Sequence, residues 1–190
     1  MNENLAYRAE PREELIDGKV VMMSPRPSFN HNQAAFNSAR LFANYLQGHR
    51  CTPIADGMDL YLTEENQFVP DFMVVCDPEK IRSDGVHGAP DLVAEVLSPS
   101  TARNDRTRKM EIYARCGVRE YWLVNPIDKS VEVYRTNGSE FILHSIYAVH
   151  PDWELAQMSE EERASVETHF KCSLFGDLDI SLERIFYRTF

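Results

Sequence analysis

Two nearly continuous apolar segments, each carrying one carboxylate, limit the possible folds of this chain more than any other feature. The first covers residues 69–76 and begins with Pro70-Asp71, and the second covers residues 91–97 with Glu95 near its centre. Segments that are apolar on both faces are typical of strands buried inside a sheet. Because a buried, unpaired carboxylate is costly, we expect Asp71 and Glu95 to be paired, protonated or bound to a metal ion.

The spacing of these two carboxylates predicts how the strands pair. In an antiparallel hairpin, the residue numbers of two opposed residues add up to the same value along the whole pair. For Asp71 and Glu95 this sum is 166, so the connection between the strands is centred on Ser83, in the polar segment 77–88. Opposed side chains lie on one face, roughly 5 Å apart at Cβ. Two carboxylates this close repel unless a cation or a proton lies between them, and Mg²⁺ commonly takes one or two carboxylates. The alternative is that one of them pairs with a buried arginine or caps a helix.

The remaining pattern predicts an α/β (α+β) architecture, a mixed central sheet flanked by helices, in a single domain over residues 1–190. Asp17-Gly18 indicates a hairpin over residues 14–24, and Ser28 or Asn30 can cap a helix over 31–47. Further helices are expected at 105–116 and, with a Ser159–Glu162 capping box, at 153–170; residues 174–186 suit a docking turn or short helix. Further strands are expected at 51–54, 58–62, 120–124, 131–135 and 140–146.

Charge and cysteine content narrow the functional classes. The net charge of −10 argues against a protein that coats nucleic acid by bulk attraction, although residues 98–120 hold six basic and three acidic side chains. No apolar run approaches the length of a membrane span, and the N-terminus has no signal-peptide core, so we expect a cytoplasmic protein. The four cysteines form no CxxC pair, which disfavours a zinc site and favours buried thiols.

An ordered set of short motifs resembles a known group. Pro70-Asp71 followed by Glu95-Val96-Leu97 resembles the PD-(D/E)xK nuclease superfamily, and more closely its Uma-two type, a family of restriction-endonuclease-like proteins. The matching pieces run through most of the chain: residues 14–18, 23–25, His31, 70–71, 95–100, Asp105 with Lys109 and Tyr113, and 117–124. The resemblance implies a restriction-endonuclease-like PD-(D/E)xK core. It also makes residues 152–170 a possible helical insertion, because the family's usual spacing there is shorter.

One departure from the superfamily pattern concerns the lysine. Leu97 stands where that lysine is expected, and in proteins of this type the lysine is thought to move to the next helix, where Lys109 fits. Asp105, Lys109 and Tyr113 share one helical face. The sequence alone favours a solvated lysine paired with Asp105, whereas the resemblance favours a catalytic one. Arg106 and Arg108 point elsewhere and could meet phosphates.

The resemblance implies Asp71, Glu95 and Lys109 as catalytic residues, with Asp71 and Glu95 holding Mg²⁺ or Mn²⁺. Glu14 could be a third acidic group, or an exposed turn residue. His31 could approach the phosphate or the metal, although the residues favour a simple polar position in the first helical turn. Tyr113 is expected to line the core, with a hydroxyl near the site as the alternative.

These expectations lead to a metal-dependent endonuclease that hydrolyses phosphodiester bonds, with DNA as the expected substrate. A homodimer is expected, because cutting two strands suits two-fold symmetry. The alternative is a catalytically silent nuclease-fold protein that serves as a nucleic-acid-binding or regulatory module. A metalloenzyme of another fold, such as a cupin barrel, is disfavoured because the six histidines show no clustering on strands.

Overall fold

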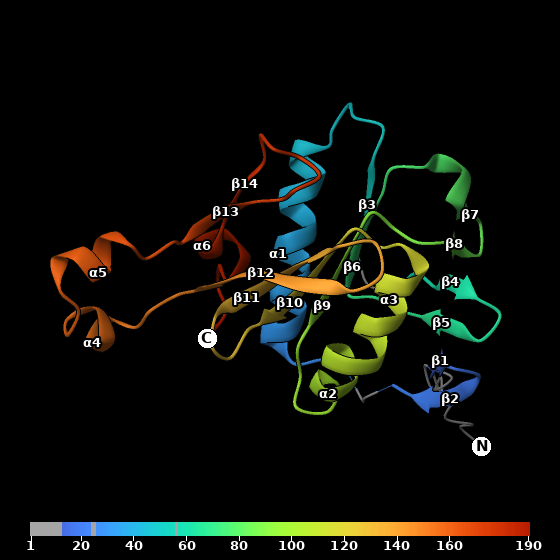
Figure 1. Ribbon diagram of the computed structural model, residues 1–190, viewed down its shortest axis with the longest axis horizontal. Coiled ribbons are helices and arrows are strands. Elements are labelled where there is room, and N and C mark those ends of the chain that lie inside the picture. Colours follow the sequence, from blue (N-terminus) through green and yellow to red (C-terminus); the bar gives the residue numbers. More distant parts are fainter. Residues whose placement is uncertain (1–12, 24–25, 56) are drawn as a thin grey trace, which may run out of the picture.

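The computed structural model describes residues 13–23, 26–55 and 57–190 (Figure 1). In this part of the chain the strands form two six-stranded sheets and one two-stranded sheet. The central sheet has the order β12 (Phe141–Ala148), β11 (Ser130–Thr136), β10 (Glu120–Asn125), β9 (Leu92–Val96), β6 (Phe72–Val75) and β3 (Thr52–Ala55). The second sheet has the order β2 (Lys19–Met22), β1 (Glu13–Ile16), β5 (Asn66–Phe68), β4 (Leu60–Thr63), β8 (Gly85–His87) and β7 (Ile81–Arg82).

Helices cover both faces of the central sheet. On one side lies α1 (Phe29–Tyr45), and on the other lies a continuous helical stretch made of α2 (Ala102–Asn104), the π-helical turn η2 (Asp105–Lys109) and α3 (Met110–Cys116) (Figure 1). This stretch connects β9 to β10, which pair in parallel and therefore need a crossover. The remaining elements are η1 (Pro78–Lys80), α4 (Asp152–Leu155), α5 (Glu160–Ala164), β13 (His169–Lys171), β14 (Asp179–Ser181) and α6 (Leu182–Ile185).

The continuous apolar character of β9 follows from its burial on two faces. Leu92, Ala94 and Val96 join the cluster that packs against α1, whereas Val93 and Leu97 join the cluster that packs against α3. Glu95 lies opposite Leu123 of β10, a residue of the second cluster, so its carboxylate faces α3. A charged group is thereby placed in the middle of a hydrophobic layer.

The predicted pairing of β6 with β9 is confirmed. The strands are antiparallel, and Phe72 opposes Ala94 while Met73 opposes Val93, which gives the index sum expected for Asp71 and Glu95. An aspartate closes each end of this pair in the same way. Asp71 accepts a hydrogen bond from the N–H of Val96 at 2.7 Å, and Asp91 accepts one from the N–H of Cys76 at 2.8 Å. The segment between the strands was expected to be a polar loop, but it contains η1, β7 and β8.

The first hairpin and α1 also follow the sequence. Asp17 and Gly18 adopt the positive φ values that a two-residue turn between β1 and β2 requires. Ser28 caps α1, its hydroxyl accepting a hydrogen bond from the N–H of His31. The motif at residues 24–25, which the resemblance used, lies outside the described residues.

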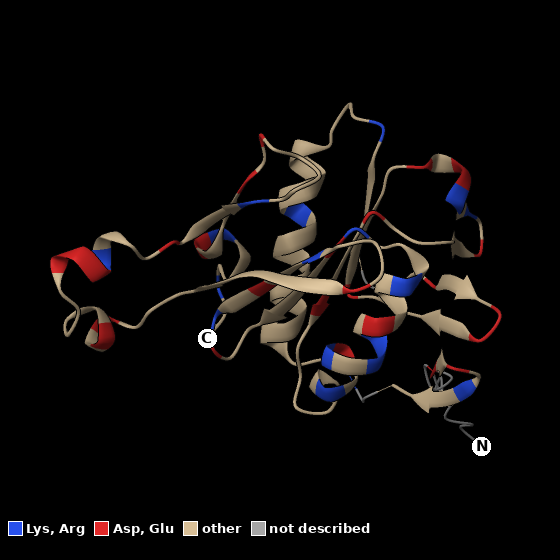
Figure 2. Cartoon of the chain, in the orientation of Figure 1, with Lys and Arg blue, Asp and Glu red and all other residues tan. Residues whose placement is uncertain are grey.

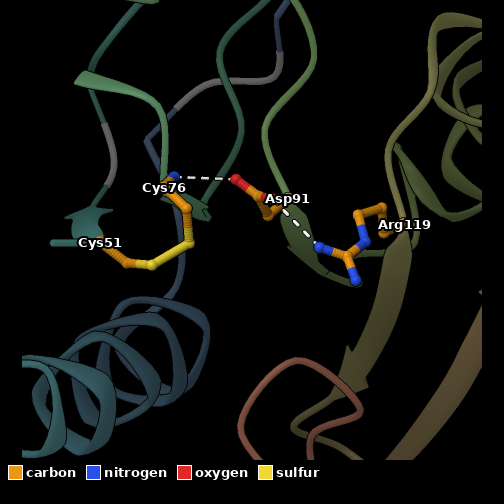
Figure 3. Close-up of a disulfide and its surroundings, with 4 residues drawn as sticks. All are labelled: Cys51, Cys76, Asp91 and Arg119. Carbon is orange, nitrogen blue, oxygen red and sulfur yellow. Dashed lines mark hydrogen bonds and ion pairs between the residues drawn. A yellow bond between two sulfur atoms is a disulfide. The ribbon is translucent and has the colours of Figure 1, made fainter. Parts of the chain in front are cut away.

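The cysteine prediction was wrong for two of the four residues. Cys51 and Cys76 form a disulfide between the ends of β3 and β6, beside the carboxylate of Asp91 (Figure 3). The register explains this bond, because Thr52 opposes Val75 and the next pair outward is Cys51 and Cys76. Sequence alone gave no means of pairing β3 with β6. Cys116 and Cys172 are free, and Cys172 is buried.

The long helix predicted at 153–170 was also wrong. Two short helices, α4 and α5, take its place, and neither of them contains a buried residue. Figure 1 shows them on an arm that reaches away from the sheets. The Ser159–Glu162 capping box is present, and it marks the start of α5. A helix start at that point is incompatible with one continuous helix. Phe170 instead lies in β13, which pairs with β14, and its ring stacks on that of Tyr147.

Among the described residues, none of the helices combines the length and the apolar character that crossing a bilayer would require.

Candidate active site

Glu95 is the centre of a buried cluster of charged side chains. Its side chain is almost inaccessible, with the residue 3% exposed. Its Oε1 accepts hydrogen bonds from Nζ of Lys109 at 3.1 Å and from the hydroxyl of Tyr113 at 2.8 Å. Both donors come from the helical crossover that follows β9. Tyr113 is fully buried, as expected of a residue that lines the core, and its hydroxyl also reaches Glu95.

Lys109 is not a solvated surface lysine, which the sequence alone had favoured. The residue is 5% exposed, and its ammonium lies 2.7 Å from Glu14, 3.1 Å from Glu95 and 3.7 Å from Asp105. Its Nζ also lies 5.5 Å from the centre of the Phe68 ring. Lys109 closes the π-helical turn that Asp105 opens, and such turns recur at functional sites. The turn directs both residues inward from an otherwise α-helical stretch.

Glu14 lies in β1 and is buried, so it is not an exposed turn residue. Its Oε1 accepts a hydrogen bond from the N–H of Val69 at 3.1 Å and also contacts Lys109. Because Val69 directly precedes Pro70-Asp71, this bond ties the first hairpin to the strand that carries Asp71.

Asp71 lies at the edge of this cluster and is more accessible than Glu95. Its Oδ2 accepts the N–H of Val96 and lies 3.4 Å from Nε2 of His31. His31 occupies the first turn of α1, as the plainer interpretation expected, and its ring nevertheless reaches Asp71. The start of α1 therefore borders the carboxylate cluster.

The cluster holds more negative than positive charge. Glu14, Asp71, Glu95 and Asp105 carry four formal negative charges, Lys109 carries one positive charge, and the excess is three. Burial raises the pKa of Glu95 well above its usual value; Lys109 opposes this effect, and the neighbouring carboxylates add to it. Burial likewise raises the pKa of Asp105. Oδ1 of Asp105 is buried and has no hydrogen-bond partner among the described residues.

Lys109 stays protonated in this environment. Burial by itself lowers the pKa of its ammonium, but attraction to Glu95, Glu14 and Asp105 outweighs burial and raises the pKa above the usual value. The lysine is therefore a fixed positive charge and a hydrogen-bond donor, and it does not act as a proton acceptor near neutral pH.

Two residues of the site were not identified from the sequence. Asp105 was placed on the helical face of Lys109 but was not named as a site residue. Tyr121 of β10 donates its hydroxyl to the carbonyl of Asp105 at 3.0 Å and so supports the π-helical turn. The four-residue spacing of Asp105 and Lys109 was the available signal for the first. Nothing in the sequence around Tyr121 distinguishes it from an ordinary core aromatic residue.

The donor chemistry of the cluster fits a hard divalent cation. In the described residues, no three His, Cys, Asp or Glu side chains stand close enough together to form a ready-made metal centre. Asp71 and Glu95 nevertheless lie opposite each other at one end of the β6–β9 pair, and Mg²⁺ often takes two carboxylates and water. The excess negative charge favours a bound cation, and so does Oδ1 of Asp105, which accepts no hydrogen bond among the described residues and meets Lys109 only at 3.7 Å.

Arg106 and Arg108, the expected phosphate contacts, are both paired with carboxylates. Arg106 forms an ion pair with Glu132, and Arg108 forms ion pairs with Asp17 and Glu111. Both guanidinium groups remain partly exposed, but these carboxylates offset their charge.

The mixed central sheet, with Asp71 and Glu95 on adjacent strands and Lys109 on the following helical crossover, has the restriction-endonuclease-like fold. The chain belongs to the Uma2 family, whose model carries the description "Putative restriction endonuclease" and matches residues 2–166. The family resemblance and the predicted fold class are confirmed.

Two curated proteins and one solved structure are similar to this chain. The chain is 32% identical over 132 residues to the uncharacterized protein slr1290 of Synechocystis sp. (strain ATCC 27184 / PCC 6803 / Kazusa), which covers 68% of this chain and 69% of the relative. It is 30% identical over 135 residues to the uncharacterized protein sll1609 of the same organism, and this match covers 69% of this chain and 76% of the relative. A crystal structure of "a putative nuclease belonging to DUF820" from Anabaena variabilis ATCC 29413 matches with a TM-score of 0.69 and 20% identity, covering 94% of this chain and 91% of that one. That likeness concerns the fold.

Proposed function

We propose that this chain is a Mg²⁺- or Mn²⁺-dependent endonuclease that hydrolyses phosphodiester bonds in DNA. The observation that carries the proposal is the position of Lys109, whose ammonium lies 3.1 Å from Glu95 although the two residues come from different elements. Burying a lysine among carboxylates is costly, and a site that uses the positive charge gives a reason for it. Membership of the Uma2 family supports the same reaction class.

Asp71 and Glu95 would hold the cation. When bound there, it would lower the pKa of a water ligand and polarise a phosphoryl oxygen. Lys109, kept protonated by its neighbours, would orient the attacking water and offset the negative charge that develops on the phosphate. Tyr113 fixes the Glu95 carboxylate through its hydroxyl.

Glu14 and His31 would support the site from two sides. Glu14 contacts Lys109 at 2.7 Å and sets the position of its ammonium. His31 lies 3.4 Å from Asp71, where its ring could orient that carboxylate or contact the phosphate. Arg106 and Arg108 would reach nucleic acid only by exchanging a carboxylate partner for a phosphate.

A homodimer belongs to this proposal, because two sites related by two-fold symmetry suit the cutting of two strands. β12 is an edge strand of the central sheet, and Ile142, Leu143 and Ile146 on it are exposed. Pairing of this edge with a second copy would cover these side chains. Sedimentation of the wild type and of Ile142→Lys tests it: a dimer that the substitution dissociates supports the proposal, and a wild-type monomer contradicts it.

The function is tested by Mn²⁺ calorimetry beside a plasmid-nicking assay. We compare the wild type with Asp71→Asn and with Asp91→Asn as a matched control. Each aspartate accepts one backbone N–H across the β6–β9 pair, but Asp91 lies at the other end of that pair, next to the Cys51–Cys76 disulfide (Figure 3). We expect Asp71→Asn to lose Mn²⁺ binding and nicking together, and Asp91→Asn to keep both.

Other outcomes would redirect the proposal. Mn²⁺ binding without nicking would favour the catalytically silent nuclease-fold module, and no binding by the folded wild type would contradict metal dependence. Equal losses in both variants would show that the substitution disturbs the strand pair rather than a site.

The pH dependence of Mn²⁺ affinity provides a further check. Because the pKa of Glu95 is raised, protons compete with the cation, so the affinity should fall as the pH falls from about 8 toward the usual glutamate pKa of about 4.3, and binding should release protons. Calorimetry in two buffers with different ionisation enthalpies measures the release. An affinity that does not change over this range would remove Glu95 from the metal site.

A further inference from the structure

One long segment of this acidic protein contains no acidic residue. The chain carries a net charge of −10, yet residues 19–55 include Lys19, Arg26, Arg40 and Arg50 and neither aspartate nor glutamate. The whole of α1 lies in this segment, and Figure 2 shows it free of acidic side chains. After Glu183 the chain adds two more arginines and no acid. The surface formed by α1 and the residues after α6 therefore carries Arg40 and Arg188 and neither aspartate nor glutamate.

This surface also exposes aromatic rings. Phe29 and Phe36 on α1 are 60% and 59% exposed, and Tyr187 and Phe190 after α6 are 46% and 89% exposed. We call these four rings, with Arg40 and Arg188, the α1 aromatic face. Single exposed apolar residues need no explanation, but four neighbouring rings indicate a binding surface.

The rings and arginines of the α1 aromatic face are arranged in contact with one another. Phe29 and Phe190 stack with their centroids 5.8 Å apart. The guanidinium of Arg40 lies 6.0 Å from the Phe36 ring and 6.0 Å from the Tyr187 ring, and that of Arg188 lies 5.3 Å from Tyr187. These contacts join the helix and the segment after α6 into one surface.

Hydrogen bonds hold that segment against α1. The amide of Asn37, which is fully buried, donates to the carbonyls of Ile185 at 3.0 Å and Tyr187 at 2.8 Å. The N–H of Phe190 donates to Oδ1 of Asn30 at 3.0 Å. The rings are therefore presented by a fixed backbone.

The arginines of this face differ from Arg106 and Arg108 in their partners. Within residues 13–23, 26–55 and 57–190, neither Arg40 nor Arg188 has a carboxylate within ion-pair distance, whereas Arg106 and Arg108 both do. Arg40 and Arg188 can thus meet phosphates without breaking an ion pair. Stacked aromatic rings beside unpaired arginines are the chemistry that binds unpaired bases and their backbone.

The α1 aromatic face and the candidate active site share the first turn of α1. Phe29 lies on the face, and His31, two residues further along, lies on the other side of the helix, where its ring is 3.4 Å from Asp71. A strand of nucleic acid lying on this face would therefore pass the end of α1 that borders the carboxylate cluster.

We propose that the α1 aromatic face binds single-stranded nucleic acid by stacking its bases on Phe29, Phe36 and Phe190 and contacting its phosphates with Arg40 and Arg188. This inference rests on the proposed nuclease function and names a single-stranded segment as what the site receives. A duplex hides the base faces that the rings would contact, which favours the unpaired form.

The test is fluorescence anisotropy of a labelled oligodeoxythymidine of about 20 nucleotides, with full-length protein in EDTA so that no cleavage occurs. We expect the oligonucleotide to bind more tightly than a duplex of the same length. Phe29→Ala with Phe36→Ala should weaken binding by about tenfold or more and leave its salt dependence unchanged. Arg40→Gln with Arg188→Gln should reduce the slope of log K against log salt by about 0.7 for each arginine.

Matched controls lie on the arm formed by α4 and α5. Trp153 is 66% exposed and Arg163 is also exposed, so Trp153→Ala and Arg163→Gln remove the same kinds of group elsewhere. Both controls should bind the oligonucleotide as the wild type does. Circular dichroism and urea unfolding confirm that all variants are folded.

Several results would overturn the inference: no binding by the wild type, tighter binding of duplex, or equal binding by the face variants and the controls. Self-association of the wild type that the face variants abolish, without nucleic-acid binding, would assign the face to a protein interface instead. Plasmid nicking separates the two proposals. Nicking that depends on Asp71 but not on the α1 aromatic face would support the nuclease proposal and contradict the single-strand-binding proposal. Oligonucleotide binding without nicking would support the single-strand-binding proposal alone.

Discussion

Two buried glutamates on neighbouring parallel strands, Glu95 of β9 and Glu120 of β10, sit in very different surroundings. Glu95 faces α3 and shares Lys109 with two other carboxylates. Glu120 lies opposite Leu92 and faces the α1 side, where Trp122 Nε1 donates to its Oε1 at 2.7 Å. The N–H of Ser173 donates to Oε2 of Glu120 at 2.8 Å, and the Ser173 hydroxyl donates to the same atom.

The difference shows that burial of a carboxylate does not by itself indicate a site. Glu120 is satisfied by neutral donors, with Arg135 at 3.7 Å, and it anchors the segment after β13 to the central sheet. Glu95 is surrounded by like charges that only one lysine offsets. We therefore expect Glu120 to matter for stability and Glu95 for the proposed function, and four substitutions test this expectation.

Lys109→Met should have the largest effect on stability. Removing the lysine leaves Glu14, Glu95 and Asp105 buried without a counter-charge, and breaking a buried pair in this way costs about 3 to 5 kcal/mol. The pKa values of Glu95 and Asp105 are already raised and should rise further. The folded variant then binds more protons than the unfolded chain, so its stability rises as the pH falls. Urea unfolding at about pH 7.5 and about pH 5 measures the change.

A loss that is equal at the two pH values would contradict the charge account of Lys109. A loss below about 1 kcal/mol, the size expected for an exposed ion pair, would mean that the lysine is solvated after all.

Glu120→Gln should lower the free energy of unfolding by about 2 kcal/mol, because the amide nitrogen that replaces one carboxylate oxygen cannot accept the hydrogen bond donated to that position by Trp122 or by Ser173. Mn²⁺ affinity should not change in this variant.

Glu95→Gln should have the opposite pair of effects. Its free energy of unfolding should stay within about 1 kcal/mol of the wild type, since the substitution relieves like-charge repulsion, while its Mn²⁺ affinity falls by more than tenfold. Urea unfolding and calorimetry on both variants decide, and equal effects in the two assays would erase the distinction.

Tyr113→Phe should have the smallest effect. It removes the hydroxyl that donates to Glu95 at 2.8 Å, at a cost of about 1 kcal/mol. Since that bond favours the ionised carboxylate, its loss should raise the pKa of Glu95 and weaken Mn²⁺ binding more at about pH 6 than at about pH 8. Calorimetry at the two pH values measures this. Tyr121→Phe is the control, because its hydroxyl contacts the carbonyl of Asp105 and not Glu95; matching losses in both variants would point to packing.

The pairings of β1 with β2 and of β6 with β9, and part of the candidate site, could be predicted from the sequence. The register of β6 and β9 followed from Asp71 and Glu95, because a strand buried on two faces leaves few positions for a charged residue. The Asp17-Gly18 turn and the Ser28 cap followed from local chemistry. The helix predicted at 153–170 is absent because the Ser159–Glu162 capping box starts a new helix inside that range.

The sequence by itself determined the elements and the presence of buried charge, since hydrophobic periodicity, caps and turns act over a few neighbouring residues. Only the tertiary structure decided which charges meet. It paired Cys51 with Cys76, placed Lys109 between Glu14 and Glu95, and separated Glu95 from Glu120 by the thickness of the sheet. These contacts depend on strand order and on a π-helical turn, and both arise from packing between segments far apart in the chain.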